Sequence, residues 1–381
     1  MRESRVRFHW EDRNYHTQFR AGVSLHSHTL HSRESLDFIG RATANTPWLS
    51  GAIKKQTDRY RALKGRDLDL RRAWWTPPLS PLHAWKLEKA QIEESLDLSA
   101  LVSLTDHDNI HAGMNLKMLD ETRECPISVE WTVPWQKTFF HLGLHNLPAG
   151  EAAQLMTELA AITADPREAR IGAMLDRLHA MDSLLIVLNH PLWDENHIGA
   201  AAHRECVDSF LARFIGFLHA FELNGLRPWK ENRGVIDLAK SLSLPLISGG
   251  DRHGREPNAC VNLTNAATFE EFVSEVRCDG WSDVLFMPQY KEPFRLRILL
   301  NLCDIIEDDP NHSLGWTHWN DRVFYRTDEG IDKSLHEFWG NKIPSVVTRF
   351  VALMSLVRHR QVRSALRFAL SEKQEMPDPV S

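Results

Sequence analysis

The chain has 381 residues, of which 43% are hydrophobic and 25% charged, a composition that fits a packed globular protein of one large or two ordinary domains. Its formal net charge of −6 gives no general attraction to nucleic acid or anionic lipid, although it allows a local basic patch. The five widely spaced cysteines form no CxxC pair, which favours reduced thiols over a disulfide framework. The N-terminus has no apolar signal-peptide core, and no run approaches the roughly 20 apolar residues of a membrane span. We therefore expect a soluble cytoplasmic protein.

Short apolar runs alternate with longer helical stretches over the first 285 residues, as is typical of β/α units. Strands are predicted within 21–27, 99–104, 183–188, 217–223 and 244–248. Helices are predicted at 81–95, 151–163 and 166–181, with another beginning at Thr268. Ser80 before Pro81 is a favourable helix start, and Thr268 and Gly280 suit the two ends of the last helix.

Two regions depart from this rhythm. Residues 41–79 are charged, then aromatic, then proline-rich, and we interpret them as a helical insertion between two β/α units. Its RRAWW segment (71–75) either packs within the insertion or roofs a binding site. Beyond about residue 286 the rhythm fades, and 343–371 is predicted to be one long helix. We expect one domain over 1–285 and a mainly helical C-terminal extension over 286–381.

Histidines and carboxylates follow several of the predicted strands. His26 and His28 are two residues apart in a strand-like run, so their side chains should share a face. The other runs end in the same kinds of residue: Asp106, His107 and Asp108; Glu130; His141 or His145; His190; and Asp251 with His253. In a β/α barrel the carboxyl ends of the strands converge on one mouth, so the sequence predicts one shared site.

About eight imidazoles and carboxylates at one mouth are unstable without a counter-charge, because repulsion and desolvation each cost several kcal/mol. Divalent cations remove that conflict. Nitrogen and oxygen ligands without thiolate suit Zn, Mn or Fe. The set exceeds the roughly three or four ligands of a single catalytic zinc, so we predict two or three metal ions.

The motifs SLHSHTLHS, TDHD, SVE, HLG, NHP and GDRH occur in the order and character of the PHP (polymerase and histidinol phosphatase) family, which the sequence resembles over residues 21–285. The resemblance implies an α/β fold, a distorted (βα)7 TIM-like barrel with its metal centre at the carboxyl ends of the strands. It also implies a metal-dependent phosphoesterase.

Carried over motif by motif, the resemblance assigns the first ion to His26, His28, Glu130 and Asp251. Glu130 would bridge to a second ion, also held by His141 and His190, so the family pattern favours His141 over His145. His107 and His253 would hold a third ion, with Glu34 as our choice for its remaining ligand. His31 is interpreted as a loop residue outside the site.

The expected reaction is hydrolysis of a small phosphomonoester or nucleotide by a metal-activated water. Arginine matches phosphate oxygens bidentately, and the candidates are Arg33, Arg227 and Arg252. Asp251 and His253 are the other candidate catalytic residues, and His253 would be the proton donor to the leaving group if no metal ion holds it. One alternative is an exonuclease or phosphodiesterase on short oligonucleotides or nucleoside bisphosphates, with the 41–79 tryptophans as a wall for the strand. Another is a catalytically silent PHP scaffold.

Overall fold

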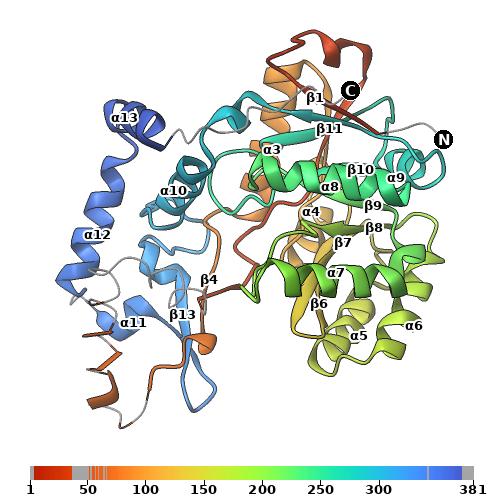
Figure 1. Cartoon of the computed structure of the whole chain (residues 1–381). Helices are drawn as coiled ribbons and strands as arrows, with labels where there is room; N and C mark the ends of the chain where they lie inside the picture. The colour runs from red at the N-terminus through yellow and green to blue at the C-terminus, as the bar shows by residue number, and fades with distance from the viewer. Residues whose placement is uncertain are drawn as a thin grey trace.

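The computed structural model describes residues 4–36, 67–340 and 343–370, together with scattered positions between 51 and 65. It is a mixed α/β protein with two five-stranded sheets and one four-stranded sheet (Figure 1). Of the 39 residues of the predicted insertion, 17 lie outside the described residues, 41–50 among them, and its helical character stays a prediction.

The first large sheet has the order β1-β12-β11-β2-β5. Its strands are Arg5–Phe8 (β1), Asp283–Phe286 (β12), Cys260–Thr264 (β11), Ala21–Ser24 (β2) and Ser99–Val102 (β5). β2 runs parallel to β5, with Val23 opposite Leu101, and antiparallel to β11. The sequence predicted β2 and β5 but not the three strands that complete this sheet.

The second large sheet has the order β10-β9-β8-β7-β6. Its strands are Leu246–Gly249 (β10), Ala220–Asn224 (β9), Leu185–Asn189 (β8), Thr138–His145 (β7) and Val129–Trp135 (β6). β8, β9 and β10 are parallel, while β7 runs antiparallel to both β6 and β8. The parallel strands are buried along their whole length, which explains their continuous apolar runs.

The two large sheets meet just beyond the carboxyl ends of β2, β5 and β10. Gly250 N–H donates to Leu25 O at 3.0 Å, and Asp251 N–H donates to His26 O at 2.7 Å. On the other side, Glu130 N–H donates to Asp106 O at 3.1 Å. These are isolated bridges, and the described strands do not form one closed sheet. The α/β class is confirmed, whereas the predicted distorted (βα)7 TIM-like barrel is not shown.

Seven helices accompany the large sheets in the described part of the chain. They are Pro81–Leu96 (α3), His111–Lys117 (α4), Ala152–Ala164 (α5), Glu168–His179 (α6), Ala200–Phe214 (α7), Trp229–Leu242 (α8) and Phe269–Arg277 (α9). Ser80 Oγ accepts from His83 N–H and Thr268 Oγ1 accepts from Glu271 N–H, so both predicted helix starts are confirmed. Gly280 has φ +61° just after α9, which an L side chain rarely adopts.

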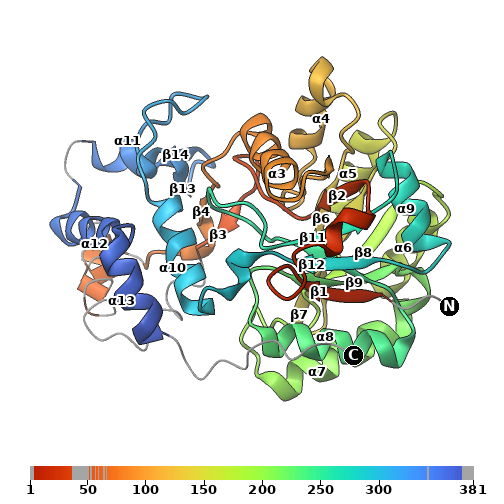
Figure 2. The ribbon, with the colours of Figure 1, turned by 90° about the horizontal axis from the view of Figure 1, so that it is seen from above.

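The third sheet joins the first fifth of the chain to its C-terminal region, in the order β14-β13-β4-β3. Its strands are Asp332–Ser334 (β14), Val323–Arg326 (β13), Ala73–Trp75 (β4) and Glu34–Ser35 (β3). Figure 2 shows it to one side of the large sheets, beside the C-terminal helices. Those helices are Phe294–Ile305 (α10), Leu335–Trp339 (α11), Ser345–Leu356 (α12) and Arg360–Leu370 (α13). We retain a boundary near residue 285 as a proposal.

The single long helix predicted for 343–371 is wrong. The chain forms α12 and α13 instead, with a break at Val357–His359. The break lets both helices pack on α10, where Met354 and Val357 share a buried cluster with Leu300. A straight helix of that length would present only one stripe to α10. No helix among the described residues is both long and apolar enough to cross a membrane.

Candidate metal centre

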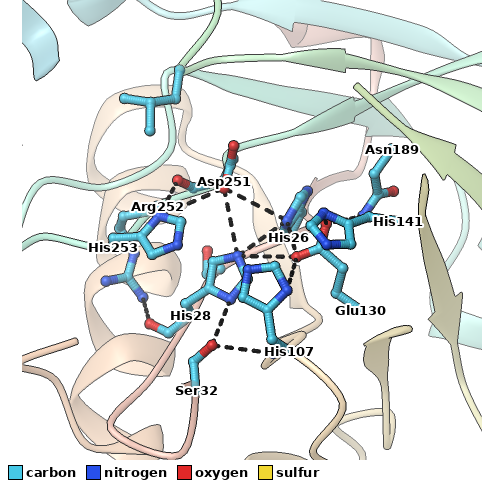
Figure 3. Close-up of polar contacts among 12 residues, drawn as sticks. His26, His28, Ser32, His107, Glu130, His141, Asn189, Asp251, Arg252 and His253 are labelled. Carbon is cyan, nitrogen blue, oxygen red and sulfur yellow. Dashed lines mark hydrogen bonds and ion pairs between the residues drawn. The ribbon is translucent and has the colours of Figure 1, made fainter. Parts of the chain in front are cut away.

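A cluster of imidazoles and carboxylates lies where the two large sheets meet (Figure 3). It contains all nine predicted ligands, namely His26, His28, Glu34, His107, Glu130, His141, His190, Asp251 and His253. Six of them are buried, and Glu34, His107 and His253 are half-buried. They come from both large sheets and from β3, so no single element builds the site.

Glu130, at the start of β6, lies at the centre of the cluster and is fully buried. Its Oε2 atom lies close to three imidazole nitrogens: His26 Nε2 at 3.0 Å, His107 Nδ1 at 3.1 Å and His28 Nε2 at 3.4 Å. Its Oε1 atom lies 3.3 Å from His190 Nε2 and 3.4 Å from His141 Nδ1. One carboxylate therefore reaches every histidine of the cluster except His253, as a bridging ligand would.

Glu34 and Asp251 flank Glu130. Glu34 lies 3.3 Å from His253 Nε2 and 3.4 Å from His107 Nε2 through its two carboxylate oxygens. Asp251 Oδ1 lies 3.5 Å from His28 Nε2. Donor atoms within 4.8 Å of one another form three overlapping groups: His26, His28 and Glu130; His107, Glu130 and His141; and His28, Glu34, His107 and His253.

The residues fit divalent ions. Glu130 Oε2 and His141 Nδ1 are buried polar atoms without a hydrogen-bond partner. Such atoms cost about 1–3 kcal/mol each, more for charged groups, unless something satisfies them. The donors are imidazole nitrogens and carboxylate oxygens, a set that suits Zn, Mn or Fe. A cation between these groups would supply the missing partner for both atoms.

The charges of the cluster are strongly coupled. Burial favours the neutral form of Glu130. The surrounding histidines, His26 foremost, nevertheless hold the pKa of Glu130 well below its usual range. Burial opposes a charge on His26 as well, but Glu130 and Glu222 raise its pKa well above the ordinary value. Burial lowers the pKa of His28 to about 3, which leaves a neutral imidazole able to act as a ligand.

Left-handed backbone occurs at three of the candidate ligands. β2 ends at Ser24, so His26 and His28 are not strand residues and the argument from strand phase is wrong. His26 has φ +62°, His190 φ +28° and Asp251 φ +51°, values that are uncommon for non-glycine residues. Three of the candidate ligands thus have strained backbone, which a surrounding network must hold in place.

Of the three candidate arginines, only Arg227 contacts a side chain of the cluster. Its Nη2 atom lies 2.8 Å from Asp251 Oδ2, and its guanidinium lies over the Trp193 ring at 4.3 Å. Arg252 instead donates through Nε to Glu88 at 2.7 Å. Arg33 is 60% exposed on its side chain and lies 3.8 Å from Asp332. Because neighbouring residues of an extended chain face opposite sides, directing Glu34 inward turns Arg33 outward.

Glu222 on β9 is a site residue that the sequence reasoning missed. Its Oε1 atom contacts His26 Nδ1, opposite the Nε2 that faces Glu130, and its Oε2 accepts from His190 N–H at 3.0 Å. Gly249 lies against it, since a Cβ there would fall on the Glu222 carboxylate. A lone glutamate within the apolar run FLHAFEL was the available signal, because buried carboxylates need partners.

Two histidines and an aspartate near the candidate ligands lie outside the three donor groups. His145 lies outside the three donor groups, and its Nδ1 is 2.8 Å from Ser103 Oγ. His31 accepts a hydrogen bond from Asn115 at 2.9 Å, outside the three donor groups. Asp106 accepts from Thr29 N–H at 2.5 Å, which fixes the loop that carries His28. Burial raises the pKa of Asp106 to about 7.

No family model matches this chain, and no curated protein matches its sequence. PsfC from Pseudomonas syringae is similar with a TM-score of 0.39 and 16% identity, over 74% of this chain and 97% of that one. A protein from Bifidobacterium adolescentis, provisionally described as a metal-dependent phosphoesterase, is similar with a TM-score of 0.32 and 13% identity, over 68% of this chain and 96% of that one. A sulfate-bound, metal-free amidohydrolase from Chromobacterium violaceum is similar with a TM-score of 0.31 and 14% identity, over 61% of this chain and 87% of that one. TM-scores below 0.5 do not establish a shared fold.

Proposed function

We propose that this protein is a metal-dependent phosphoesterase of the PHP type, with two or three divalent ions, Mn, Fe or Zn, at the nine-residue cluster. One observation carries the proposal: a buried Glu130 carboxylate lies within 3.4 Å of five imidazole nitrogens from four segments of the chain. That arrangement matches a bridging ligand between ions rather than a structural site, which closes around a single ion. The distorted barrel belongs to the same proposal, supported by the bridges that join the two large sheets.

The protein's own groups suit an anionic substrate. When bound, divalent ions supply a water nucleophile at neutral pH and stabilise charge on phosphoryl oxygens. Arg227, held between Asp251 and the Trp193 ring, presents a planar guanidinium beside the cluster for a phosphate oxygen. Asp251 positions that guanidinium, while His253 lies at the half-buried side, where it can donate a proton to a leaving group when no third ion holds it.

Aromatic rings beside the cluster favour a nucleotide or the end of a short oligonucleotide over a purely aliphatic phosphate. Trp75, which is half-buried, lies 5.7 Å from His253 between ring centroids. Trp193 lies at the other flank, on Arg227. Base–aromatic stacking contributes roughly 1–3 kcal/mol per base. Nucleic-acid ends therefore remain the second candidate substrate.

The test combines metal counting with hydrolysis. The purified protein, loaded with Mn, is expected to hold two or three ions per chain. It should release phosphate from an aryl phosphate and from mononucleotides, and short oligonucleotides distinguish the exonuclease alternative. Binding of ions without any turnover would indicate the silent scaffold instead. Fewer than two ions per chain together with no turnover would contradict the proposal.

Substitutions locate the activity. His190→Ala and Asp251→Ala each remove a candidate ligand, so we expect kcat to fall by at least about 100-fold, since ion loss removes the water nucleophile. His31→Ala is the matched control, because His31 lies outside the donor groups and should leave kcat within about twofold. Unchanged turnover in both ligand variants would place the chemistry elsewhere.

A further inference from the structure

Glu34 reaches the cluster on β3, a strand of only two residues. Its partner is β4, with Glu34 opposite Trp75 and Ser35 opposite Trp74. Leu36 N–H donates to Ala73 O at 3.0 Å and extends this pairing by one bond. A two-stranded ribbon is marginally stable by itself in water, so β4 needs support of its own.

The support comes from the C-terminal region, more than 240 residues away in the sequence. β13 pairs with β4 on the side opposite β3, with Phe324 opposite Trp74 and Val323 opposite Trp75. The rings of Phe324 and Trp74 stack with centroids 5.6 Å apart. Thr76 N–H donates to Arg322 O at 2.9 Å, so the pairing continues past the end of β4.

β13 is itself anchored. Arg322, only 1% exposed, donates from Nη2 to Ile305 O and Glu307 O, both at 2.7 Å, at the end of α10. β14 covers the outer edge of β13, with Phe324 opposite Ser334. The chain of contacts therefore runs from α10 through β13 and β4 to β3 (Figure 2).

Side chains reinforce the same path. The Arg33 guanidinium lies 5.0 Å from the Trp74 ring, and that of Arg326 lies 5.6 Å from it. Trp75, next along β4, lies 5.7 Å from His253, one of the three histidines around Glu34. β4 thus touches the ion group formed by His28, Glu34, His107 and His253 both through its backbone and through an indole.

We propose that β13 and β14 are a positioning element for the third ion, holding Glu34 through β4 so that the group with His28, His107 and His253 is complete. The inference rests on the proposed metal centre and assigns a role to the C-terminal region. The other two donor groups lie between the large sheets and contain no residue of β3 or β4. Their ions should therefore be insensitive to changes in β13.

The variant that tests this is Phe324→Ala in the full chain. It removes the ring that stacks on Trp74. We expect the dissociation constant of the Mn ion that Glu34→Gln weakens to rise about 10-fold or more, as for loss of a group that orients a ligand. The constants of the other ions should stay within about twofold. Calorimetric titration of the metal-free protein with Mn measures the dissociation constant of each ion. Lys333→Ala on β14 is the matched control, because this exposed side chain lies outside the β4 contacts.

A double-mutant cycle separates positioning from general loosening. In a Glu34→Gln background the carboxylate is already gone, so Phe324→Ala should add less than about a twofold change to the third constant. Phe324→Tyr should restore the wild-type constant, because it keeps the ring. If Phe324→Ala fails to fold, Phe324→Leu takes its place in the cycle.

Each outcome decides between the two proposals. Wild-type constants for all ions in Phe324→Ala, or full additivity with Glu34→Gln, overturn the positioning role and leave the phosphoesterase intact. A wild-type chain with two ions and no third also overturns it, again without harm to a two-ion hydrolase. Fewer than two ions and no turnover in the wild type remove the proposed function itself.

Discussion

Glu222 controls the ligand atom that His26 offers. A carboxylate on Nδ1 fixes the proton there and leaves Nε2, which faces Glu130, free to bind a cation. The same carboxylate accepts from His190 N–H and from Asn224 Nδ2, each at 3.0 Å. Glu222 thus holds two strained segments at once, those of His26 and His190.

Replacing this carboxylate tests its role. Glu222→Gln keeps the shape but offers one acceptor oxygen where three donors converge, so at least one donor loses its partner. We expect metal affinity to fall about 10–100-fold, measured by competition with a chelator of known affinity. Glu205→Gln, an exposed carboxylate on α7, should leave the affinity unchanged. Equal affinities in both variants would show that Glu222 has no part in ion binding.

Helix α3 connects the two loops that carry His26, His28, Asp251 and His253, four of the nine candidate ligands. Glu88 on α3 is fully buried and accepts from four donors: Ser24 Oγ at 2.9 Å, Ser27 Oγ at 3.1 Å, Arg252 Nε at 2.7 Å and Asn258 N–H at 3.1 Å. Arg252 in turn donates to Gly254 O at 2.7 Å. Arg252, one of the three arginines expected to bind a substrate phosphate, therefore has a structural role instead: it fixes the loop between Asp251 and His253.

Removing the Glu88 carboxylate should be costly. Glu88→Ala leaves the Arg252 guanidinium buried without its counter-ion, and breaking a buried pair in this way costs about 3–5 kcal/mol of the free energy of unfolding. Urea unfolding of the metal-free protein measures the loss. Glu94→Ala, on an exposed position of the same helix, should change that free energy by less than about 0.5 kcal/mol. A small change in the free energy of unfolding of Glu88→Ala would mean that the Glu88–Arg252 pair contributes little to stability.

At the scale of the whole molecule, buried neutral histidines make folding sensitive to acid. His219 is 8% exposed; its Nδ1 accepts from Ile186 N–H at 2.9 Å, and Nε2 lies 3.1 Å from His179 Nδ1. Burial, with Arg277 and His179 nearby, lowers the pKa of His219 to about 3. Below pH 6.5, the ordinary histidine pKa, the unfolded chain binds a proton that the folded chain does not. The free energy of unfolding therefore decreases as the pH is lowered.

The expected size is about 1.4 kcal/mol of unfolding free energy per pH unit below 6.5, continuing until the folded pKa is reached. Above pH 6.5 this group contributes no pH dependence. His219→Asn keeps an acceptor for Ile186 N–H but does not titrate, so its stability should fall less steeply than that of the wild type between pH 6.5 and 5.5. Urea unfolding of metal-free protein at both pH values checks this, and parallel slopes would contradict it.

The sequence by itself determined the α/β class, the five predicted strands and the residue types of the cluster. Periodicity and helix-end signals are local, and a polar residue at the end of an apolar run is visible without coordinates. The nine candidate ligands could therefore be named from the sequence, and in the structure they lie together. The split between α12 and α13 was not visible locally, because it depends on packing against α10.

Tertiary structure decided which charged residues face the cluster and which support it. Arg33 and Arg252 stand beside ligands in the sequence, yet one faces outward and the other pairs with Glu88, because adjacent side chains diverge. Glu222 and Glu88 carry no motif, since their partners come from distant segments. The attachment of β13 to β4 likewise joins segments about 250 residues apart. Such pairings depend on chain topology, which one-dimensional patterns do not encode.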